Sequence, residues 1–288
     1  EVAQSTARAL EALAILREAD ETPDVHVTRT VLGSLAGKHM DTKENYEKYL
    51  ALLDSGRFFY PFHLSEIYSV YQRAGHHRVS DESLLLEFKV CRAFWVSEKS
   101  GTVIDTPYPL HDEDTALSFM SSVLCRIVYE SAESELRTAA LQLLEGMITC
   151  RELSLIPLFR GLGENLHQLF AIDKEWSIAN LIPLFSPSNS SNEVAEALWS
   201  GFLNNVTDGN GEMDLLEPYL IESCKAGLIS SESSNFNQML HKRLFRNHSI
   251  ELEEAMVSAF NDKGLALEAI HIIFEKDMSA QFDKYWSE

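Results

Sequence analysis

Apolar residues recur along this chain at the three- to four-residue spacing of amphipathic helices. The first stripe contains Ala7, Leu10, Leu13, Ala14 and Leu16, and another begins after Pro23. Side chains at positions i, i+3, i+4 and i+7 lie on one face of a helix, which can then be buried. Similar stripes follow through most of the chain. The sequence therefore predicts an all-α protein made of stacked antiparallel helix pairs, with about 14 helices in total.

Short polar residues precede several of these stripes, as expected at helix starts. Asp41-Thr42-Lys43-Glu44 has the form of a capping box, and Ser80 stands before the stripe that begins at Leu84. A Ser, Thr or Asp side chain at an N-cap accepts a hydrogen bond from a free backbone N–H of the first turn. We therefore expect helices to begin at both places.

The helical pattern fails between residues 98 and 111. Gly101, Pro107 and Pro109 lie close together there, and such residues interrupt helices. The sequence therefore predicts an N-terminal helical subdomain over 1–97, a connecting loop over 98–111 and a second helical region over 112–288.

The second region contains a helix with small residues at its centre. Its pattern consists of Leu136, Arg137, Ala139, Ala140 and Leu143. This pattern resembles the second helix of HEAT and armadillo repeats, in which Ala-rich positions allow close helix packing. A second instance is suggested by Leu181-Ile182-Pro183-Leu184-Phe185, which is similar to the family's Pro-containing first helix. It is followed at second-helix positions by Asn192, Val194, Ala197 and Leu198.

Related strings recur with uneven spacing. Leu155-Ile156-Pro157-Leu158-Phe159 repeats the Leu-Ile-Pro-Leu-Phe pattern, and Pro218 lies in a similar one. The resemblance covers residues 112–276 and implies an irregular HEAT-like α-solenoid that presents a curved surface to protein partners. An unrelated helical bundle is the alternative, because any packed helical hairpin can produce these motifs.

Charge narrows the classes of partner. The chain has 44 acidic and 24 basic residues and a net charge of −20. Such a field repels nucleic-acid phosphates and anionic lipids, so we expect no direct nucleic-acid binding and no membrane binding. No apolar run approaches the length of a membrane span.

Cysteine usage points to a compartment. The four cysteines are far apart and form no C-x-x-C pair, so buried free thiols are expected, as is typical of cytoplasmic or other reducing intracellular surroundings. Because the first residue is Glu, we expect the chain to be a fragment, a processed form or a renumbered one.

One stretch is depleted of positive charge. No Lys or Arg occurs from Glu175 to Cys224, where eight carboxylates fall, and the polar run from Ser186 to Asn192 predicts a protruding loop. We interpret the stretch as an acidic surface for a basic protein partner, although a merely solvated face is the alternative. The predicted binding residues are Glu193, Glu196, Asp208, Glu212, Asp214 and Glu217.

No catalytic motif stands beside this surface, and no cofactor or catalytic residue is indicated. The pair His111-Asp112 resembles the metal-binding pair of the HD phosphohydrolases, with His76 and His77 as further candidate ligands. Two hypotheses follow. The first is a protein-interaction scaffold or adaptor, in one form an inhibitor or immunity-type protein. The second is a helical metal-dependent hydrolase with a site near these four residues.

Overall fold

Helices make up most of the described part of the protein. The computed structural model describes residues 2–19, 25–36, 42–53, 80–99, 111–150, 155–205 and 211–229. Within these ranges it contains eleven α-helices and no strand. The prediction of an all-α fold is confirmed for these residues. The predicted total of about 14 helices includes stretches outside them and stays a prediction.

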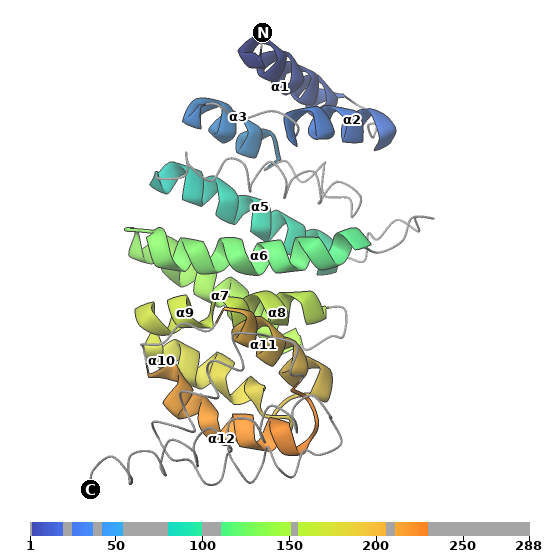
Figure 1. Ribbon diagram of the computed structural model, residues 1–288. Helices are drawn as coiled ribbons and strands as arrows, with labels where there is room; N and C mark the ends of the chain where they lie inside the picture. Colours follow the sequence, from blue (N-terminus) through green and yellow to red (C-terminus); the bar gives the residue numbers. More distant parts are fainter. Residues whose placement is uncertain are drawn as a thin grey trace, which may run out of the picture. The chain divides into compact units, whose positions relative to one another are not determined.

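The chain divides into two compact units, residues 1–147 and 148–288. The first unit holds α1 (Val2–Glu18), α2 (Val25–Ala36), α3 (Lys43–Leu53), α5 (Asp81–Lys99), α6 (His111–Glu130) and nearly all of α7 (Ser134–Cys150) (Figure 1). The range of the predicted connecting loop, 98–111, includes the last two residues of α5 and the first residue of α6. Its other residues lie outside the described ranges, so the domain boundary predicted there stays a prediction.

Helices of the first unit pack against their neighbours in chain order. α1 contacts α2 and α3, α3 contacts α5, and α5 contacts α6. The predicted stripe residue Leu13 is fully buried, and so are Leu32, Leu53 and Leu124. The apolar stripes of consecutive helices thus form the core of this unit.

The helix starts agree with the polar signals in the sequence. The Thr42 hydroxyl accepts a hydrogen bond of 3.2 Å from the backbone N–H of Asn45, so the capping oxygen of α3 comes from Thr42 and the helix begins at Lys43. At α5 the Ser80 hydroxyl accepts a 3.2 Å hydrogen bond from the backbone N–H of Ser83. Each cap satisfies one of the N–H groups that a helix start leaves without an intrahelical partner.

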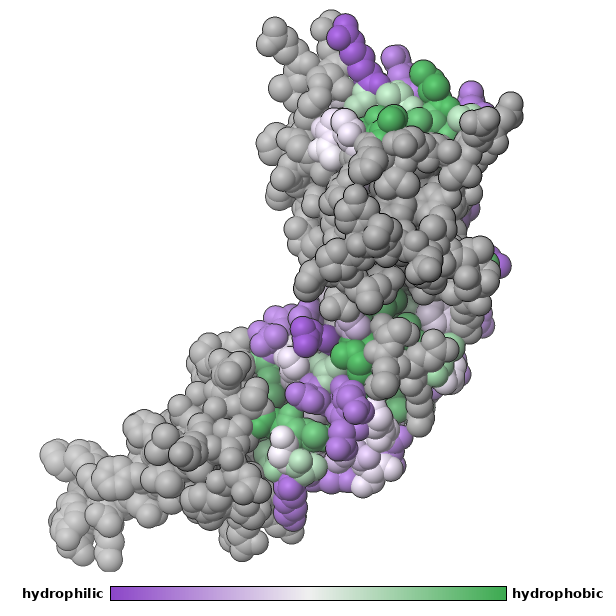
Figure 2. Space-filling view, turned by 90° about the vertical axis from the view of Figure 1, so that its right-hand side faces the viewer, coloured by the Kyte–Doolittle hydropathy of each residue, from purple (hydrophilic) through white to green (hydrophobic). Residues whose placement is uncertain are grey.

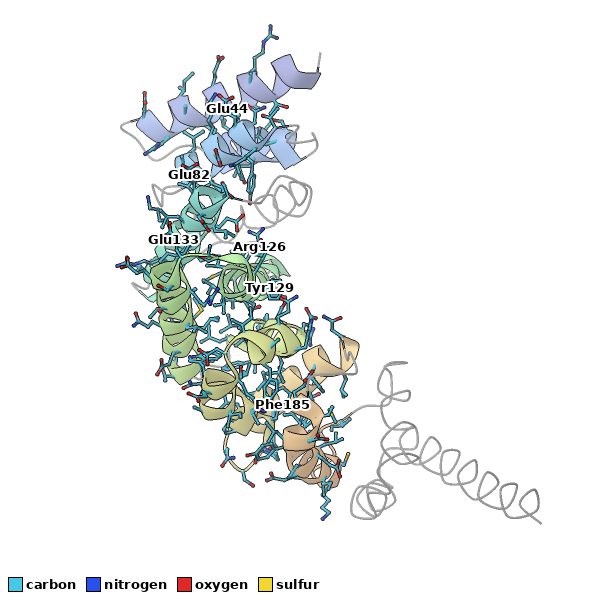
Figure 3. The ribbon with its side chains drawn as sticks, turned by 90° about the vertical axis from the view of Figure 1, so that its left-hand side faces the viewer. Glu44, Glu82, Arg126, Tyr129, Glu133 and Phe185 are labelled. Carbon is cyan, nitrogen blue, oxygen red and sulfur yellow. The ribbon has the colours of Figure 1, made fainter. Side chains whose placement is uncertain are left out.

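A buried polar cluster joins three helices of this unit. The Tyr46 hydroxyl of α3 donates a 2.9 Å hydrogen bond to Oε1 of Glu87 on α5, and Arg126 reaches from α6 to pair with the same carboxylate (Figure 3). Glu87 is 2% exposed. Glu130, one turn after Arg126, lies 3.8 Å from its guanidinium. A carboxylate so deeply buried is tolerated because a charge and a hydroxyl compensate the water that it has lost.

The second unit begins with shorter helical elements. They are α8 (Ile156–Glu164), α9 (Leu166–Ile172), α10 (Lys174–Trp176), the π-helical turn η4 (Ser177–Leu181) and the 3₁₀ turn η5 (Ile182–Phe185), followed by α11 (Asn192–Asn204) and α12 (Glu212–Lys225). Within this unit α8 and α11 make the most extensive contact, and η5 packs against both α11 and α12.

Proline explains the irregular turns before α11. Pro183 has no N–H to donate, and its ring would clash with the carbonyl four residues earlier in a regular helix. The backbone widens to a π turn before it and tightens to a 3₁₀ turn around it. The string from Leu181 to Phe185 therefore forms part of this irregular segment, whereas Pro157 sits in the first turn of α8, where proline is tolerated.

Two glycines allow the backbones of α8 and α11 to touch. A Cβ added at Gly163 of α8 would lie 2.2 Å from the Leu198 carbonyl oxygen of α11, and one added at Gly201 of α11 would lie 1.9 Å from the Arg160 carbonyl oxygen of α8. The contact is reciprocal, since each glycine faces the carbonyl three residues before the other. Any larger residue would force the helices apart.

Aromatic packing fixes α11 against η5 and α12. Trp199 is buried, and its ring meets Phe185 edge-on with a centroid distance of 4.9 Å, while Phe202 completes the cluster. The indole N–H of Trp199 donates to the Phe185 carbonyl at 3.0 Å and to the Ser223 hydroxyl at 2.9 Å. Ser223 donates in turn to the Phe185 carbonyl at 3.1 Å. The buried polar atoms of this cluster therefore satisfy one another.

We predict that Gly163→Ala destabilises the protein by about 1–3 kcal/mol, because the new methyl group overlaps a backbone carbonyl that cannot move independently. Denaturant unfolding followed by circular dichroism measures the change. Gly146→Ala is the matched control. Gly146 lies inside α7 with no atom within 4 Å of an added Cβ, so helix propensity should raise stability by about 0.5–1 kcal/mol. Equal effects of the two substitutions would contradict the backbone contact.

We also predict that Glu87→Gln lowers the free energy of unfolding by about 2–3 kcal/mol, because the buried Arg126 then loses its main counter-charge. Glu44→Gln is the control, since Glu44 pairs with Lys48 at 2.7 Å on the exposed face of α3 and solvent screens that pair. Only the first substitution should shift the denaturation midpoint clearly. A matching loss in both variants would argue against a stabilising role for the buried cluster.

Candidate partner-binding groove

The predicted acidic residues fall into three groups in the structure. Glu193 and Glu196 are exposed on α11, whereas Asp214 is exposed and Glu217 half-buried on α12. Asp208 lies outside the described residues. The described carboxylates are close in the sequence, but the structure places them on two separate helices.

Glu212 departs from the prediction, because it is only 2% exposed. It occupies the first position of α12, and residues four and eight positions later, Leu216 and Leu220, belong to the buried face of that helix. Glu212 therefore lies on the same inward-facing side. It does not belong to an exposed acidic surface.

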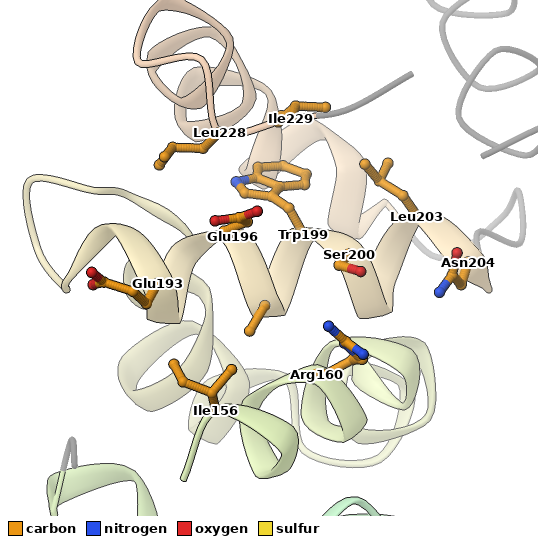
Figure 4. A pocket seen from close by; sticks show the side chains of 11 residues that line it. Ile156, Arg160, Glu193, Glu196, Trp199, Ser200, Leu203, Asn204, Leu228 and Ile229 are labelled. Carbon is orange, nitrogen blue, oxygen red and sulfur yellow. The ribbon is translucent and has the colours of Figure 1, made fainter. Parts of the chain in front are cut away.

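A groove of about 580 Å³ lies between α11, the start of α8 and the segment after α12 (Figure 4). We call it the α8–α11 groove. Among the described residues its lining includes the two exposed α11 carboxylates and one basic side chain, that of Arg160. The described lining residues are Ile156, Arg160, Glu193, Glu196, Ala197, Trp199, Ser200, Leu203, Asn204, Leu228 and Ile229. Asp214 and Glu217 are not among the lining residues.

One face of α11 supplies most of this lining. Glu193, Glu196, Ser200 and Leu203 follow each other at intervals of three or four residues, so their side chains lie along one side of the helix. Ala197 lies between them and leaves room through its small size. The face bears carboxylates at its first turns and neutral or apolar groups further along.

The opposite wall belongs to α8. Ile156 and Arg160 are four residues apart and so project from the same side of that helix. The Arg160 backbone is also the point at which α8 touches Gly201, next to Ser200 on α11. The close glycine contact thus determines where the Arg160 guanidinium enters the groove.

Hydrogen bonds at the start of α11 favour the ionised form of Glu193. The Ser191 hydroxyl caps α11 by accepting a 3.3 Å hydrogen bond from the backbone N–H of Val194. The backbone N–H of Glu193 and then the Ser191 hydroxyl lower the pKa of the Glu193 carboxyl. Glu is already ionised at neutral pH, and the lowered pKa extends the negative charge of Glu193 to more acidic pH.

The polar loop before α11 is anchored to α12, and its predicted protrusion stays a prediction. The Ser186 hydroxyl is buried and donates a 2.6 Å hydrogen bond to Oε2 of Glu222 on α12, and Ser188 donates to the other carboxylate oxygen. These two bonds lower the pKa of Glu222, with Ser186 the larger cause. They anchor the loop to α12 and fix the point at which α11 begins.

The described residues contain no feature that supports a metal site or a membrane span. His76 and His77 lie outside them, and His111 and Asp112 stand in the first turn of α6, where their side chains are not described. Elsewhere in the described ranges, no three His, Cys, Asp or Glu side chains are placed to hold a metal ion. No helix in those ranges is long and apolar enough to cross a membrane.

Sequence reasoning missed two parts of the groove. Arg160 precedes the stretch without Lys and Arg, so the charge pattern that defines the stretch does not include it. Leu228 and Ile229 follow the stretch and carry no motif. The only sequence signal that relates Arg160 to α11 is the pair of glycines, Gly163 and Gly201, and their contact is visible only once the helices are packed.

We predict that Ser186→Ala raises the pKa of Glu222 toward its ordinary value, because a hydrogen bond to the ionised carboxylate is lost. Carboxyl-carbon NMR during a pH titration measures it. Since the folded-state pKa is depressed, these bonds stabilise the protein above the unfolded-state pKa and lose their effect as the pH falls through the folded-state value. Ser122→Ala, whose hydroxyl bonds within α6 to the Ser118 carbonyl, should leave the Glu222 titration unchanged. An unchanged Glu222 pKa in Ser186→Ala would contradict the assignment.

Comparison with known proteins does not supply a function. No protein family, characterised protein or solved structure matches this chain. What the protein does must therefore be argued from its own residues and their arrangement.

Proposed function

We propose that this protein is a protein-interaction scaffold or adaptor whose groove binds a basic protein partner. The observation that carries the proposal is that Glu193 and Glu196 are both exposed and both line the α8–α11 groove. Two carboxylates one helical turn apart create a local negative potential, and a cavity beside them offers contact area. A partner with Lys or Arg at its binding surface complements both features.

The described surface in the lower half of Figure 2 carries hydrophobic residues interspersed among hydrophilic ones. Protein interfaces commonly combine apolar contacts with a polar rim in this way. The net charge of −20 would also attract a basic partner over a distance and speed association.

We also propose that the helices after residue 112 form divergent HEAT-like repeats, an architecture that presents helix faces to protein partners. The close contact of α8 with α11 through small residues supports this proposal, because HEAT-like repeats pack their helices closely at small side chains. An inhibitor or immunity-type protein that neutralises a basic target is one form of this function.

We predict that the protein captures a basic partner from native lysate at low salt and releases it as the salt concentration rises, because ions screen exposed charge pairs. Glu193→Gln combined with Glu196→Gln should lower the captured amount about tenfold. Asp214→Asn combined with Glu217→Gln removes two carboxylates outside the groove and serves as the matched control. Quantitative mass spectrometry of the bound fraction gives the readout. The proposal fails if nothing basic is retained at low salt.

A further inference from the structure

The α8–α11 groove carries charges of opposite sign at different positions along its length. Glu193 and Glu196 lie toward the start of α11, whereas Arg160 projects from α8 opposite Ser200 (Figure 4). The groove is therefore not uniformly acidic. A ligand that neutralises both ends needs a positive and a negative group held apart in a defined order.

Apolar contacts lie beside these charges. Leu228 and Ile229 are on one side of α11 and Ile156 is on the other, while the buried Ala197 and Leu203 form part of the floor. An apolar side chain entering between the charged ends would lose water on several sides. Such burial supplies affinity, whereas the charges supply orientation and selectivity.

The length of the groove matches a short stretch of extended chain. From Glu193 to Asn204 the α11 axis rises by about 16 Å, at about 1.5 Å per residue. About five extended residues cover that distance at about 3.3 Å each. Nucleic acid fits poorly, since two carboxylates at one end repel its phosphates.

We propose that the groove binds an extended peptide segment of the partner that carries a Lys or Arg, then an aliphatic residue, then an Asp or Glu. The basic side chain pairs with Glu193 and Glu196, the aliphatic one packs toward Leu228 and Ile229, and the acidic one pairs with Arg160. This inference rests on the proposed function and specifies what the partner must present. Arg160 becomes the selectivity residue for the acidic position.

One neighbouring group makes the role of Arg160 testable by a gain of binding. Glu164 lies one turn after Arg160 on α8 and is half-buried. Burial raises the pKa of its carboxyl, and the Arg160 charge acts in the opposite direction. The negative charge of Glu164 therefore lies close enough to Arg160 to oppose the approach of an acidic ligand group. Glu164 itself does not line the groove.

A displayed library of random twelve-residue peptides, selected on the full chain, tests the proposal. We expect the enriched peptides to share a basic, an aliphatic and an acidic position in that order or its reverse. Selection on Arg160→Glu should replace the acidic position by a basic one. An enriched set that contains only basic residues, or the same motif selected on Arg160→Glu, would overturn the inference, and so would the absence of any enriched motif.

Affinities of one enriched peptide, measured by fluorescence anisotropy, give the quantitative test. Glu164→Gln should tighten binding about threefold by removing a negative charge that opposes the acidic ligand group, and Arg160→Gln should weaken it about tenfold. Ser200→Tyr, which fills the groove, should abolish it, while Asp214→Asn should change nothing. Circular dichroism confirms that each variant is folded. An unchanged affinity in Arg160→Gln or Ser200→Tyr contradicts the groove as the binding site.

The same variants separate this inference from the proposed function. If Glu193→Gln with Glu196→Gln loses the partner from lysate while Arg160→Gln and Ser200→Tyr retain it, an acidic surface binds the partner but the groove does not read a peptide. If no variant affects capture, or nothing is captured, the proposed function itself fails.

Discussion

The reciprocal contact of Gly163 and Gly201 with the backbone of the facing helix is the constraint on which the second unit depends. It allows α8 and α11 to approach until main-chain atoms touch, which side chains at either position would prevent. The distance between α8 and α11 then determines where the groove residues of the two helices lie. It places the Arg160 side chain at the groove, and it brings Ile156 opposite the acidic face of α11. The candidate binding site therefore depends on how closely α8 and α11 pack. Its charged side chains project from these two packed helices.

Buried polar groups supply the specificity that apolar packing alone lacks. In the first unit Glu87 is compensated by Tyr46 and Arg126, so the register of three helices is set by a single carboxylate. In the second unit a cluster of uncharged groups sets the register in the same way, because the indole N–H of Trp199 and the Ser223 hydroxyl both donate to the Phe185 carbonyl. Apolar stripes tolerate small sliding movements, whereas a buried donor displaced from its acceptor loses a hydrogen bond that water cannot replace. The two clusters thus select one packing from many similar ones.

Charged side chains make the two ends of the groove different. Hydrogen bonds at the start of α11 favour the ionised form of Glu193, and the loop that precedes this helix is bonded to Glu222, whose pKa Ser186 and Ser188 lower. The Ser191 cap and this loop thus hold the start of the helix that bears Glu193. At the other end of the groove, the Arg160 charge opposes the rise that burial gives to the pKa of Glu164. An acidic ligand group would therefore approach Arg160 near an existing negative charge.

Local chemistry made the helices predictable: apolar spacing defined the buried face of α1, Ser80 marked the start of α5, and the depletion of Lys and Arg drew attention to α11. The apolar spacing and the cap operate within one or two helical turns, and the depletion is a property of residues 175–224 along the chain, so all three can be read from the sequence by itself. Helical spacing places Glu212 on the same face of α12 as the buried Leu216 and Leu220, so its burial follows a pattern that is present in the sequence. What tertiary structure alone decided is that Arg160 of α8 lies in the same groove as Glu193 and Glu196 of α11. The physical reason is that a groove depends on the distance and angle between helices, and these follow from contacts between residues far apart in the chain.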